Sequence, residues 1–388
     1  MSKKNLIFLS LLLALALLVG CAGGGQQAPQ ENNQQAQDGQ KAASDLKVGI
    51  VLSSGGKGDK SFNDSALRGL DRAKEEGLIA DYKYIEPKEV AAAEKGLRFL
   101  AQQGYDLVIG VGFMQKDAVD TVSKEFADTK FAIIDDVVDN PNVASLTFKE
   151  HEGSFLAGAL AALLTTHEEI EGINAKEIVG FLGGMDVPLI HKFELGYTSG
   201  VDYINETEGT DVKVRVNYTG SDPSAFNDPA KGKEISLAQY NAGADIIYHA
   251  AGGTGIGLFE AAAQTGSYAI GVDSDQDWNQ PGYILTSVQK RVDNAVFATV
   301  TAIKEGNFEA GLKEYGLEEK GVALTPLTEA GVTVKAAQEA GDITTEDVAK
   351  IEALKAKIPV DVKEKIEDIK EKIIAGEIDV PNYYDQTQ

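Results

Sequence analysis

The folded part of the chain begins with the stretch LKVGIVLSSGGKGDKSFNDSALRGLDRAKEEG, residues 46–77. Residues 46–53 are apolar and rich in β-branched side chains, which predicts a buried strand. A glycine-rich turn follows, and then apolar residues from Ala66 to Ala73 recur at helical spacing until Gly77, a typical helix end. A strand, a turn and a helix in this order form the repeating unit of a parallel α/β sheet.

The same alternation continues along the chain in two halves of similar size. We therefore expect two doubly wound parallel-sheet lobes, each covered by helices on both faces, with a ligand site in the cleft beyond the carboxyl ends of the strands. Residues 344–374 are expected to form a pair of charged helices, broken near Pro359, with a solvated face. Further strands are predicted at 82–85, 106–111, 131–134, 143–148, 177–182, 211–218, 245–249, 268–272 and 283–288, and further helices at 90–103, 118–126, 151–166, 189–204, 230–242, 254–264 and 291–304.

Composition limits the possible functions. A chain of 388 residues with 43% hydrophobic side chains is long enough for two domains and is not disordered as a whole. The balance of 36 basic to 60 acidic residues argues against a nucleic-acid partner. One cysteine excludes a disulfide framework, and four scattered histidines argue against a metal site. Of these histidines, His249 could face the cleft, and surface or capping positions are expected for most of the others.

The first 44 residues read as a targeting signal followed by a tether. The apolar run 6–19 is too short to span a bilayer, and it follows two lysines, so residues 1–20 are interpreted as a signal peptide. The sequence before Cys21, the only cysteine, resembles a bacterial lipobox, which implies cleavage there and lipidation of Cys21; an ordinary signal peptide is the alternative. Residues 21–44 have no large apolar side chain and are expected to be disordered. We expect a lipid-anchored protein on the extracytoplasmic face of the cell membrane.

Motifs for catalysis are weak or missing. Asp59 stands where a phosphate-binding loop needs glycine before Lys60, and the glycines of residues 252–257 do not fit the dinucleotide-binding spacing. No nucleophile or metal motif accompanies the paired carboxylates Asp135 and Asp136. We therefore expect a protein that is not an enzyme and needs no cofactor.

Polar and aromatic residues instead gather just after the predicted strands. Carboxylates can accept two hydrogen bonds from a vicinal diol, and aromatic rings can stack on a flat base, so this set suits a neutral ligand with hydroxyls and a ring. For any single residue a cap or turn role is the alternative, and Asp59, Ser61 and Asn63 could all cap the following helix. The residues concerned are 59–64, 112–114, Asp135, Asp136, Phe226, Asp273, Gln289 and Lys290.

At these positions the sequence resembles the basic membrane protein (BMP) family. These bacterial lipoproteins have a type I periplasmic-binding-protein fold and include purine nucleoside receptors of ABC transporters. The resemblance covers about residues 46–310 and the terminal segment IIAGEIDVP. Its motifs include GDKSFND (58–64), VIGVGF (108–113), FAIIDDVVD (131–139), NVASLTFKEHEGSFLAG (142–158) and SVQKRVDNAV (287–296).

The resemblance implies a role for particular residues. Phe62 and Phe226 would sandwich the base, Asp135 would bond its edge, and Asp273 with Lys290 would hold the ribose hydroxyls. Whether Asp135 or Asp136 faces the ligand stays open. The implied ligand-binding set is Asp59, Phe62, Asn63, Phe113, Asp135, Asp136, Phe226, Gly253, Asp273 and Lys290, with no catalytic residue and no metal ligand.

The resemblance also implies how the lobes are connected and what they do. The lobes are expected to comprise residues 45–146 with 288–322, and 147–287 with 323–388, with crossings near 145–149, 286–290 and 322–327. A monomer is expected, which would close over a purine nucleoside and deliver it to a permease. The same fold binding a sugar or another small solute, or a surface antigen or adhesin, are the alternatives.

Overall fold

The computed structural model describes residues 45–386. The predicted signal peptide, the lipidation site Cys21 and the tether lie outside this range. Within the described range, no helix combines the length and the apolar character that crossing a membrane requires.

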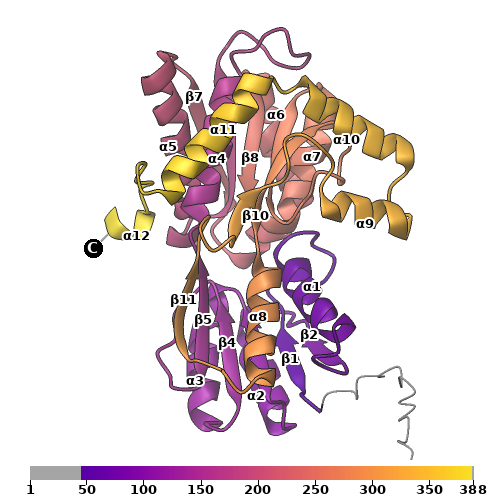
Figure 1. The fold of residues 1–388 in the computed structure, drawn as a ribbon, viewed down its shortest axis with the longest axis vertical. Coiled ribbons are helices and arrows are strands. Elements are labelled where there is room, and N and C mark those ends of the chain that lie inside the picture. The colour runs from indigo at the N-terminus through magenta and orange to yellow at the C-terminus, as the bar shows by residue number, and fades with distance from the viewer. Residues whose placement is uncertain (1–44, 387–388) are drawn as a thin grey trace, which may run out of the picture. The chain divides into compact units, whose positions relative to one another are not determined.

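Residues 45–386 form two lobes, each built on a six-stranded sheet (Figure 1). The strand order is β11-β5-β4-β3-β1-β2 in lobe 1 and β12-β10-β9-β8-β6-β7 in lobe 2. All strand pairs are parallel except β10 with β12, so the predicted parallel-sheet architecture is confirmed. Lobe 1 contains β1 (Val48–Val51), α1 (Phe62–Glu75), β2 (Tyr82–Ile85), α2 (Ala93–Gln102), β3 (Leu107–Val111), α3 (Lys116–Glu125), β4 (Lys130–Ile134), β5 (Val143–Phe148), α8 (Val292–Lys304) and β11 (Gly311–Tyr315).

Lobe 2 carries the remaining strands and most of the helices. The two sheets match strand for strand, since β4 and β9 occupy the same place in their respective orders. The elements of lobe 2 are α4 (Glu150–Leu164), β6 (Ile178–Met185), α5 (Pro188–Glu208), β7 (Lys213–Gly220), α6 (Pro229–Asn241), β8 (Ala244–Ala250), α7 (Gly255–Thr265), β9 (Tyr268–Asp273), β10 (Ile284–Lys290), β12 (Val322–Leu324), α9 (Val332–Ala340), α10 (Thr345–Lys357), α11 (Val360–Ile374) and α12 (Tyr383–Gln386).

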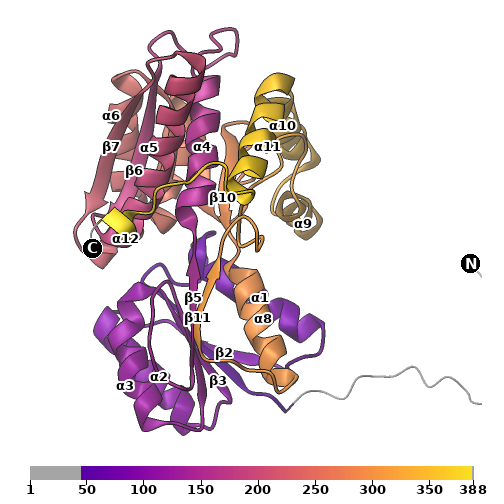
Figure 2. The same cartoon turned by 60° about the vertical axis from the view of Figure 1, so that its left-hand side comes forward.

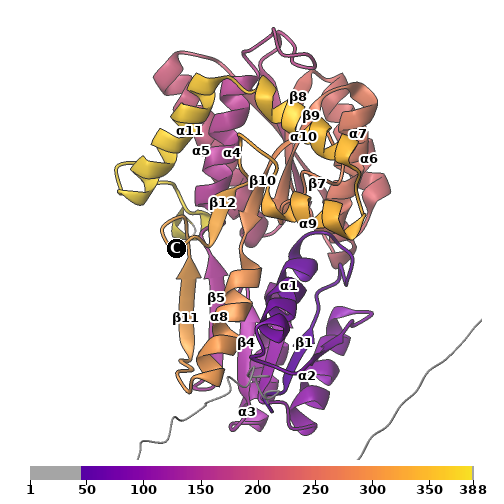
Figure 3. The same ribbon diagram turned by 45° about the vertical axis from the view of Figure 1, so that its right-hand side comes forward.

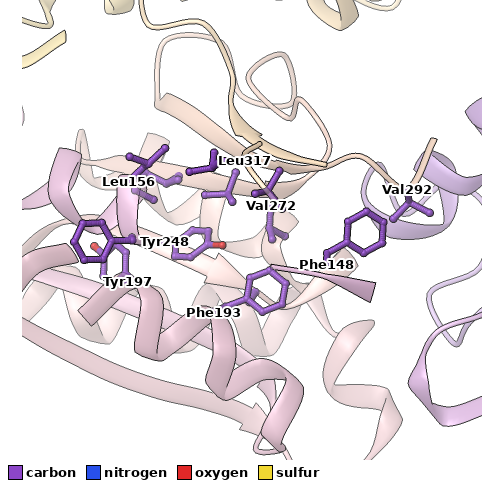
Figure 4. Packing of buried hydrophobic residues seen from close by; sticks show 14 of the residues in the cluster. Phe148, Leu156, Phe193, Tyr197, Tyr248, Val272, Val292 and Leu317 are labelled. Carbon is purple, nitrogen blue, oxygen red and sulfur yellow. The ribbon is translucent and has the colours of Figure 1, made fainter. Parts of the chain in front are cut away.

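Helices cover both faces of each sheet, as the apolar strands require (Figure 2). In lobe 1, α1 and α8 pack on one face and α2 and α3 on the other; in lobe 2 the pairs are α4 with α5 and α6 with α7. The core between α1, α8, α4 and α5 continues from one lobe to the other. Figure 4 shows Phe148, Val272 and Val292 of this cluster near the junction.

The strand ladders correct the expected lobe boundaries by a few residues. Thr147 and Phe148, expected in lobe 2, pair with β11 in the sheet of lobe 1. Residues 288–290 and Val322, expected in lobe 1, lie in the sheet of lobe 2, where residues 288–290 pair with residues 322–324. The chain leaves β5 and β10 only after the last residue of each strand has paired in its own sheet. No local sequence signal marks these positions.

The C-terminal part contains elements that the sequence analysis did not predict. Strands β11 and β12 and helix α9 fall in this group, whereas the helix pair broken near Pro359 is confirmed as α10 and α11. These two helices are not only a solvated face, because Leu354 and Ile369 are among the residues that they bury against lobe 2. In Figure 3, α9, α10 and α11 lie along lobe 2, with α9 on the side of lobe 1.

Candidate functional site

A cleft between the two lobes gathers almost all the predicted ligand residues. The space within it is about 620 Å³, including the part open to solvent. The predicted residues that line it are Asp59, Phe62, Asn63, Phe113, Asp135, Phe226, Gly253, Asp273 and Lys290.

Asp136 and His249 do not line the cleft. The Asp136 carboxylate turns outward and pairs with Lys116 at 2.7 Å. His249 is fully buried, and its Nε2 lies 3.0 Å from Oε1 of Gln276. Of the two adjacent acids, Asp135 is therefore the one at the cleft, and His249 has an interior structural role.

Asp135 and Asp273 stand at equivalent strand ends in the two lobes. Asp135 directly follows β4, and Asp273 is the last residue of β9. Both have a left-handed backbone conformation, with φ of 71° and 62°, which is uncommon for residues other than glycine. Each side chain is mostly buried, with 8% of its residue surface exposed. Two carboxylates in strained backbone positions at a shared cleft are typical of a functional site.

Lys290 brings a positive charge to the end of β10. Its Nζ lies 2.6 Å from the Asp135 carboxylate and 3.1 Å from Oε1 of Glu150. The same atom lies 4.8 Å from the centre of the Phe62 ring, a cation–π distance. Burial lowers the pKa of Lys290, but the carboxylates of Asp135, Glu150 and Asp273 outweigh burial and raise this pKa above its ordinary value. Lys290 therefore stays charged.

The surplus of carboxylates shifts the protonation of this cluster. Burial raises the pKa of Asp135 to about 7, with Lys290 opposing the rise and Glu150 adding to it. The pKa of Asp273 is also raised, because the effect of burial exceeds the opposing effects of Lys290 and of the hydrogen bond from Ser61. For Glu150, burial favours the neutral acid, but Lys192 and Lys290 outweigh it and lower the pKa to about 2. Glu150 is thus ionised, and Asp135 titrates near neutral pH.

Asp59 and Asn63 use their polar atoms within lobe 1. Oδ1 of Asp59 accepts from the backbone N–H groups of Ser61 and Asp64, at 3.0 and 3.1 Å, and Oδ2 accepts from the backbone and side-chain nitrogens of Asn63, both at 2.9 Å. Oδ1 of Asn63 accepts from the backbone N–H of Ser53 at 2.8 Å. Burial raises the pKa of Asp59 to about 6. The geometry gives Asp59 the capping role, whereas Asn63 ties the loop at Ser53 to the helix. The contact of either residue with a ligand stays a prediction.

The two predicted stacking rings come from opposite lobes. Phe62 is the first residue of α1, and Phe226 ends a short 3-10 helix, residues 223–226. A Cβ atom at Gly184 would lie 2.3 Å from the Phe226 ring, so the ring needs a glycine there. The hydroxyls of Thr219 and Thr254 donate to the carbonyl of Ala225 at 2.8 and 2.9 Å, which fixes the loop before the ring.

Hydrogen bonds join the lobes directly at the start of α1. Ser61 Oγ donates to Oδ2 of Asp273 at 2.7 Å, and Ser274 Oγ donates to the carbonyl of Ser61 at 2.8 Å. The Gln276 amide donates to the carbonyl of Lys60 at 3.1 Å. Asp273 therefore contacts the opposite lobe as well as the cleft.

Sequence reasoning missed several residues of the site. Leu189, Ile190 and Phe193 of α5 line the cleft, but their helical spacing marked them only as part of a helix. Glu150 and Lys192 lie behind Lys290, where both are buried and paired at 2.6 Å. The position of Glu150 directly after a strand was a usable signal, but it is one acid among 60 acidic residues.

Comparison with known proteins gives a consistent assignment. A family model described as ABC transporter substrate-binding protein PnrA-like matches residues 46–383. A Lactococcus lactis protein named ABC transporter nucleoside-binding protein BmpA is 34% identical over 83% of this chain and 91% of its own length. An uncharacterized lipoprotein of Pyrococcus abyssi is 33% identical over 95% of this chain and 89% of its own length.

A solved structure agrees with these relatives. The crystal structure of an ABC transporter solute-binding protein from Aeropyrum pernix has a TM-score of 0.79 at 34% identity, covering 87% of this chain and 94% of that one. The family description names a substrate-binding protein, and the solved structure is named as that of a solute-binding protein. With the type I periplasmic-binding-protein fold and a cleft between its lobes, the chain belongs to the Bmp family of PnrA-like ABC transporter substrate-binding proteins.

Proposed function

We propose that this protein binds a purine nucleoside in the cleft between its lobes. The observation that carries the proposal is the pairing of two aromatic side chains, Phe62 from lobe 1 and Phe226 from lobe 2, with the polar groups of Asp135, Asp273 and Lys290 around one cavity. Flat rings suit a purine base, and the carboxylates suit the hydroxyls of a ribose. A relative named as a nucleoside-binding protein supports this choice of ligand.

The magnitudes are sufficient for tight binding. Stacking on an aromatic ring contributes about 1–3 kcal/mol per base, and each charge-assisted hydrogen bond contributes about 1.5–3 kcal/mol. A few contacts of each kind exceed the roughly 8 kcal/mol that micromolar affinity requires, before association costs are subtracted.

We further propose that the protein delivers this nucleoside to an ABC transporter permease. Only the closed form contacts a ligand from both lobes, so the ligand stabilises closure, and the lobe crossings after β5 and β10 would serve as the hinge. Lipidation at Cys21 would hold a monomer on the extracytoplasmic face of the membrane. The naming of a relative as a lipoprotein supports this location.

Calorimetry on the purified full-length lipoprotein tests the ligand. Small molecules that co-purify are first identified by mass spectrometry and removed. Inosine, adenosine, guanosine and ribose are then titrated separately. Binding of at least one nucleoside with micromolar or better affinity, and no heat with ribose, is the expected result. Binding of ribose without any nucleoside would assign the cleft to a sugar and reject the proposal.

A further inference from the structure

Glu150 is a buried carboxylate that does not line the cleft but contacts Lys290, which does. It is the first residue of α4, directly after the first crossing between lobes, and only 1% of its surface is exposed. Its two oxygens face different ammonium groups. Oε1 lies 3.1 Å from Nζ of Lys290, and Oε2 lies 2.6 Å from Nζ of Lys192. The Glu150 carboxylate thus bridges two lysines.

Lys192 anchors this bridge to the fold. It lies on α5, is 3% exposed, and donates from Nζ to the carbonyl of Phe148 at 2.6 Å. Phe148 is the last residue of β5, so this ammonium joins α5 of lobe 2 to the strand of lobe 1 that leads into the crossing. The charges then alternate from Lys192 through Glu150 and Lys290 to Asp135. In this row of alternating charges, each buried ammonium group has a carboxylate as its partner, as buried charges require.

Lys290 needs such support because its side chain is flexible. A lysine ammonium is a point charge on a four-carbon stem, with no preferred bonding plane of its own. The Asp135 carboxylate alone would leave Nζ free to rotate about one contact. Glu150 supplies a second contact, and Nζ comes to lie near the rings of Phe62, Phe148 and Phe193, at 4.8, 5.3 and 5.6 Å from their centres.

We propose that Glu150 is a positioning residue that fixes the Lys290 ammonium at the cleft, and that Lys192 holds Glu150 in place. Glu150 itself does not touch the ligand. The effect of Glu150 on ligand affinity rests on the proposed function, but its effect on the geometry of Lys290 does not.

The geometry is tested without ligand by NMR of the lysine ammonium groups in the full-length protein. The Lys290 signal is assigned by its absence in Lys290→Arg. In the wild type this signal is expected to be sharp, because two buried carboxylates hold the ammonium away from solvent. In Glu150→Gln it should broaden or shift strongly. In Lys192→Met it should also change, but less than in Glu150→Gln, because Glu150 loses its anchor and keeps its charge next to Lys290. Asp136→Asn, which breaks only the outward pair with Lys116, is the control and should leave the signal unchanged.

Affinity is tested with the same variants and inosine. Glu150→Gln should weaken binding about tenfold or more, because one fixed charge partner of Lys290 is lost. Lys192→Met should weaken binding less than Glu150→Gln does. If Glu150→Gln folds poorly, the double variant Glu150→Gln/Lys192→Met removes one charge of each sign and is used in its place. The double variant should still bind inosine more weakly than the wild type, although it leaves the net buried charge unchanged.

Two outcomes would overturn the proposal. One is an unchanged Lys290 signal in the Glu150→Gln or double variant. The other is wild-type affinity for inosine in a protein whose Lys290 signal has changed. If the wild type binds no nucleoside, the proposed function fails, and the NMR comparison alone then decides whether Glu150 positions Lys290.

Discussion

The strand ends at Asp135 in lobe 1 and Asp273 in lobe 2 are equivalent in the fold but differ in their partners. Both stand at the carboxyl end of the corresponding strand in matching sheets, both have positive φ, and both are equally buried. Both partners belong to the opposite lobe: Asp135 pairs with the charged Lys290 of β10 at 2.6 Å, whereas Asp273 accepts a hydrogen bond from the neutral hydroxyl of Ser61 at 2.7 Å.

This difference shows how two repeats of one supersecondary pattern can take separate roles. A carboxylate paired with an ammonium belongs to an electrostatic cluster, and its protonation follows that cluster. A carboxylate bonded to a hydroxyl also joins the two lobes, but it does so through a neutral partner. The strand fixes where each acid stands, and the neighbouring lobe decides what it does.

Removing Lys290 should produce the largest loss of stability, because it leaves Asp135 without its charged partner. Lys290→Met leaves the buried carboxylates of Asp135 and Glu150 without this partner, so the free energy of unfolding should fall by about 3–5 kcal/mol. Urea denaturation measures this change. The control is Lys116→Met, which breaks the exposed pair with Asp136 and should cost about 0–1 kcal/mol. Equal losses in the two variants would contradict the role assigned to the cluster.

The protonation of Asp135 should be visible in the pH dependence of stability. Its pKa of about 7 in the folded protein exceeds the ordinary value of 3.8. The folded state therefore retains a proton that the unfolded state has released between pH 4 and 7, so this residue makes stability fall as the pH rises. The loss should be on the order of 3 kcal/mol across that window.

Asp135→Asn removes this contribution, so the unfolding free energy of the wild type should decline relative to the variant from pH 4 to pH 7. Chemical denaturation at several pH values measures the two slopes. Asp136→Asn is the adjacent control and should keep the wild-type slope. A wild-type profile parallel to that of Asp135→Asn would show that Asp135 does not carry the proton.

The aromatic ring of lobe 2 can be displaced without touching either acid. Gly184→Ala places a Cβ about where the Phe226 ring lies, so the ring must move. If Phe226 stacks on the base, nucleoside binding should weaken by about 1–3 kcal/mol. Calorimetry with inosine measures the change. Gly220→Ala in the neighbouring strand, where the nearest atom is 3.3 Å from the new Cβ, is the control and should bind nearly as the wild type does.

The smallest effect is expected at the bond between the lobes. Ser61→Ala removes the hydroxyl that donates to Asp273, which should cost about 1–2 kcal/mol. Small-angle scattering of the unliganded protein should show a larger radius of gyration, because closure loses a direct contact. Ser65→Ala, in the same helix, is the control, because the Ser65 hydroxyl accepts from the backbone N–H of Asp293 within lobe 1. An unchanged radius in Ser61→Ala would mean that Asp273 is not coupled to closure through this bond.

Much of the architecture was predictable because it depends on local pattern. The alternation of apolar strands with amphipathic helices gave two parallel sheets, and the rule that ligands bind at the carboxyl ends of strands gave the cleft. Nine of the ten predicted ligand residues line it. The tenth, Asp136, follows Asp135 directly. The two could not be separated by sequence, because the left-handed turn at Asp135 decides which carboxylate faces inward.

Other features required partners that are distant in the chain. Strands β11 and β12 are short, and they are stabilised by pairing with β5 and β10 rather than by their own pattern. Glu150 and Lys290 are 140 positions apart in the sequence, and a lone acid or lysine gives no sign that it will be buried. Asp59 is the opposite case, because its four bonds go to residues 61–64 and the sequence already offered capping as an alternative role.

The amino-acid sequence by itself determined the two-lobed α/β fold, the place of the cleft and the kinds of side chain around it, because hydrophobic periodicity and strand-end position are properties of neighbouring residues. Only the tertiary structure decided which acid faces the cleft, which partner from the opposite lobe Asp135 and Asp273 each take, and which buried charges support Lys290. Those outcomes depend on burial and on distances between segments far apart in the chain, and these arise only when both lobes are folded and in contact.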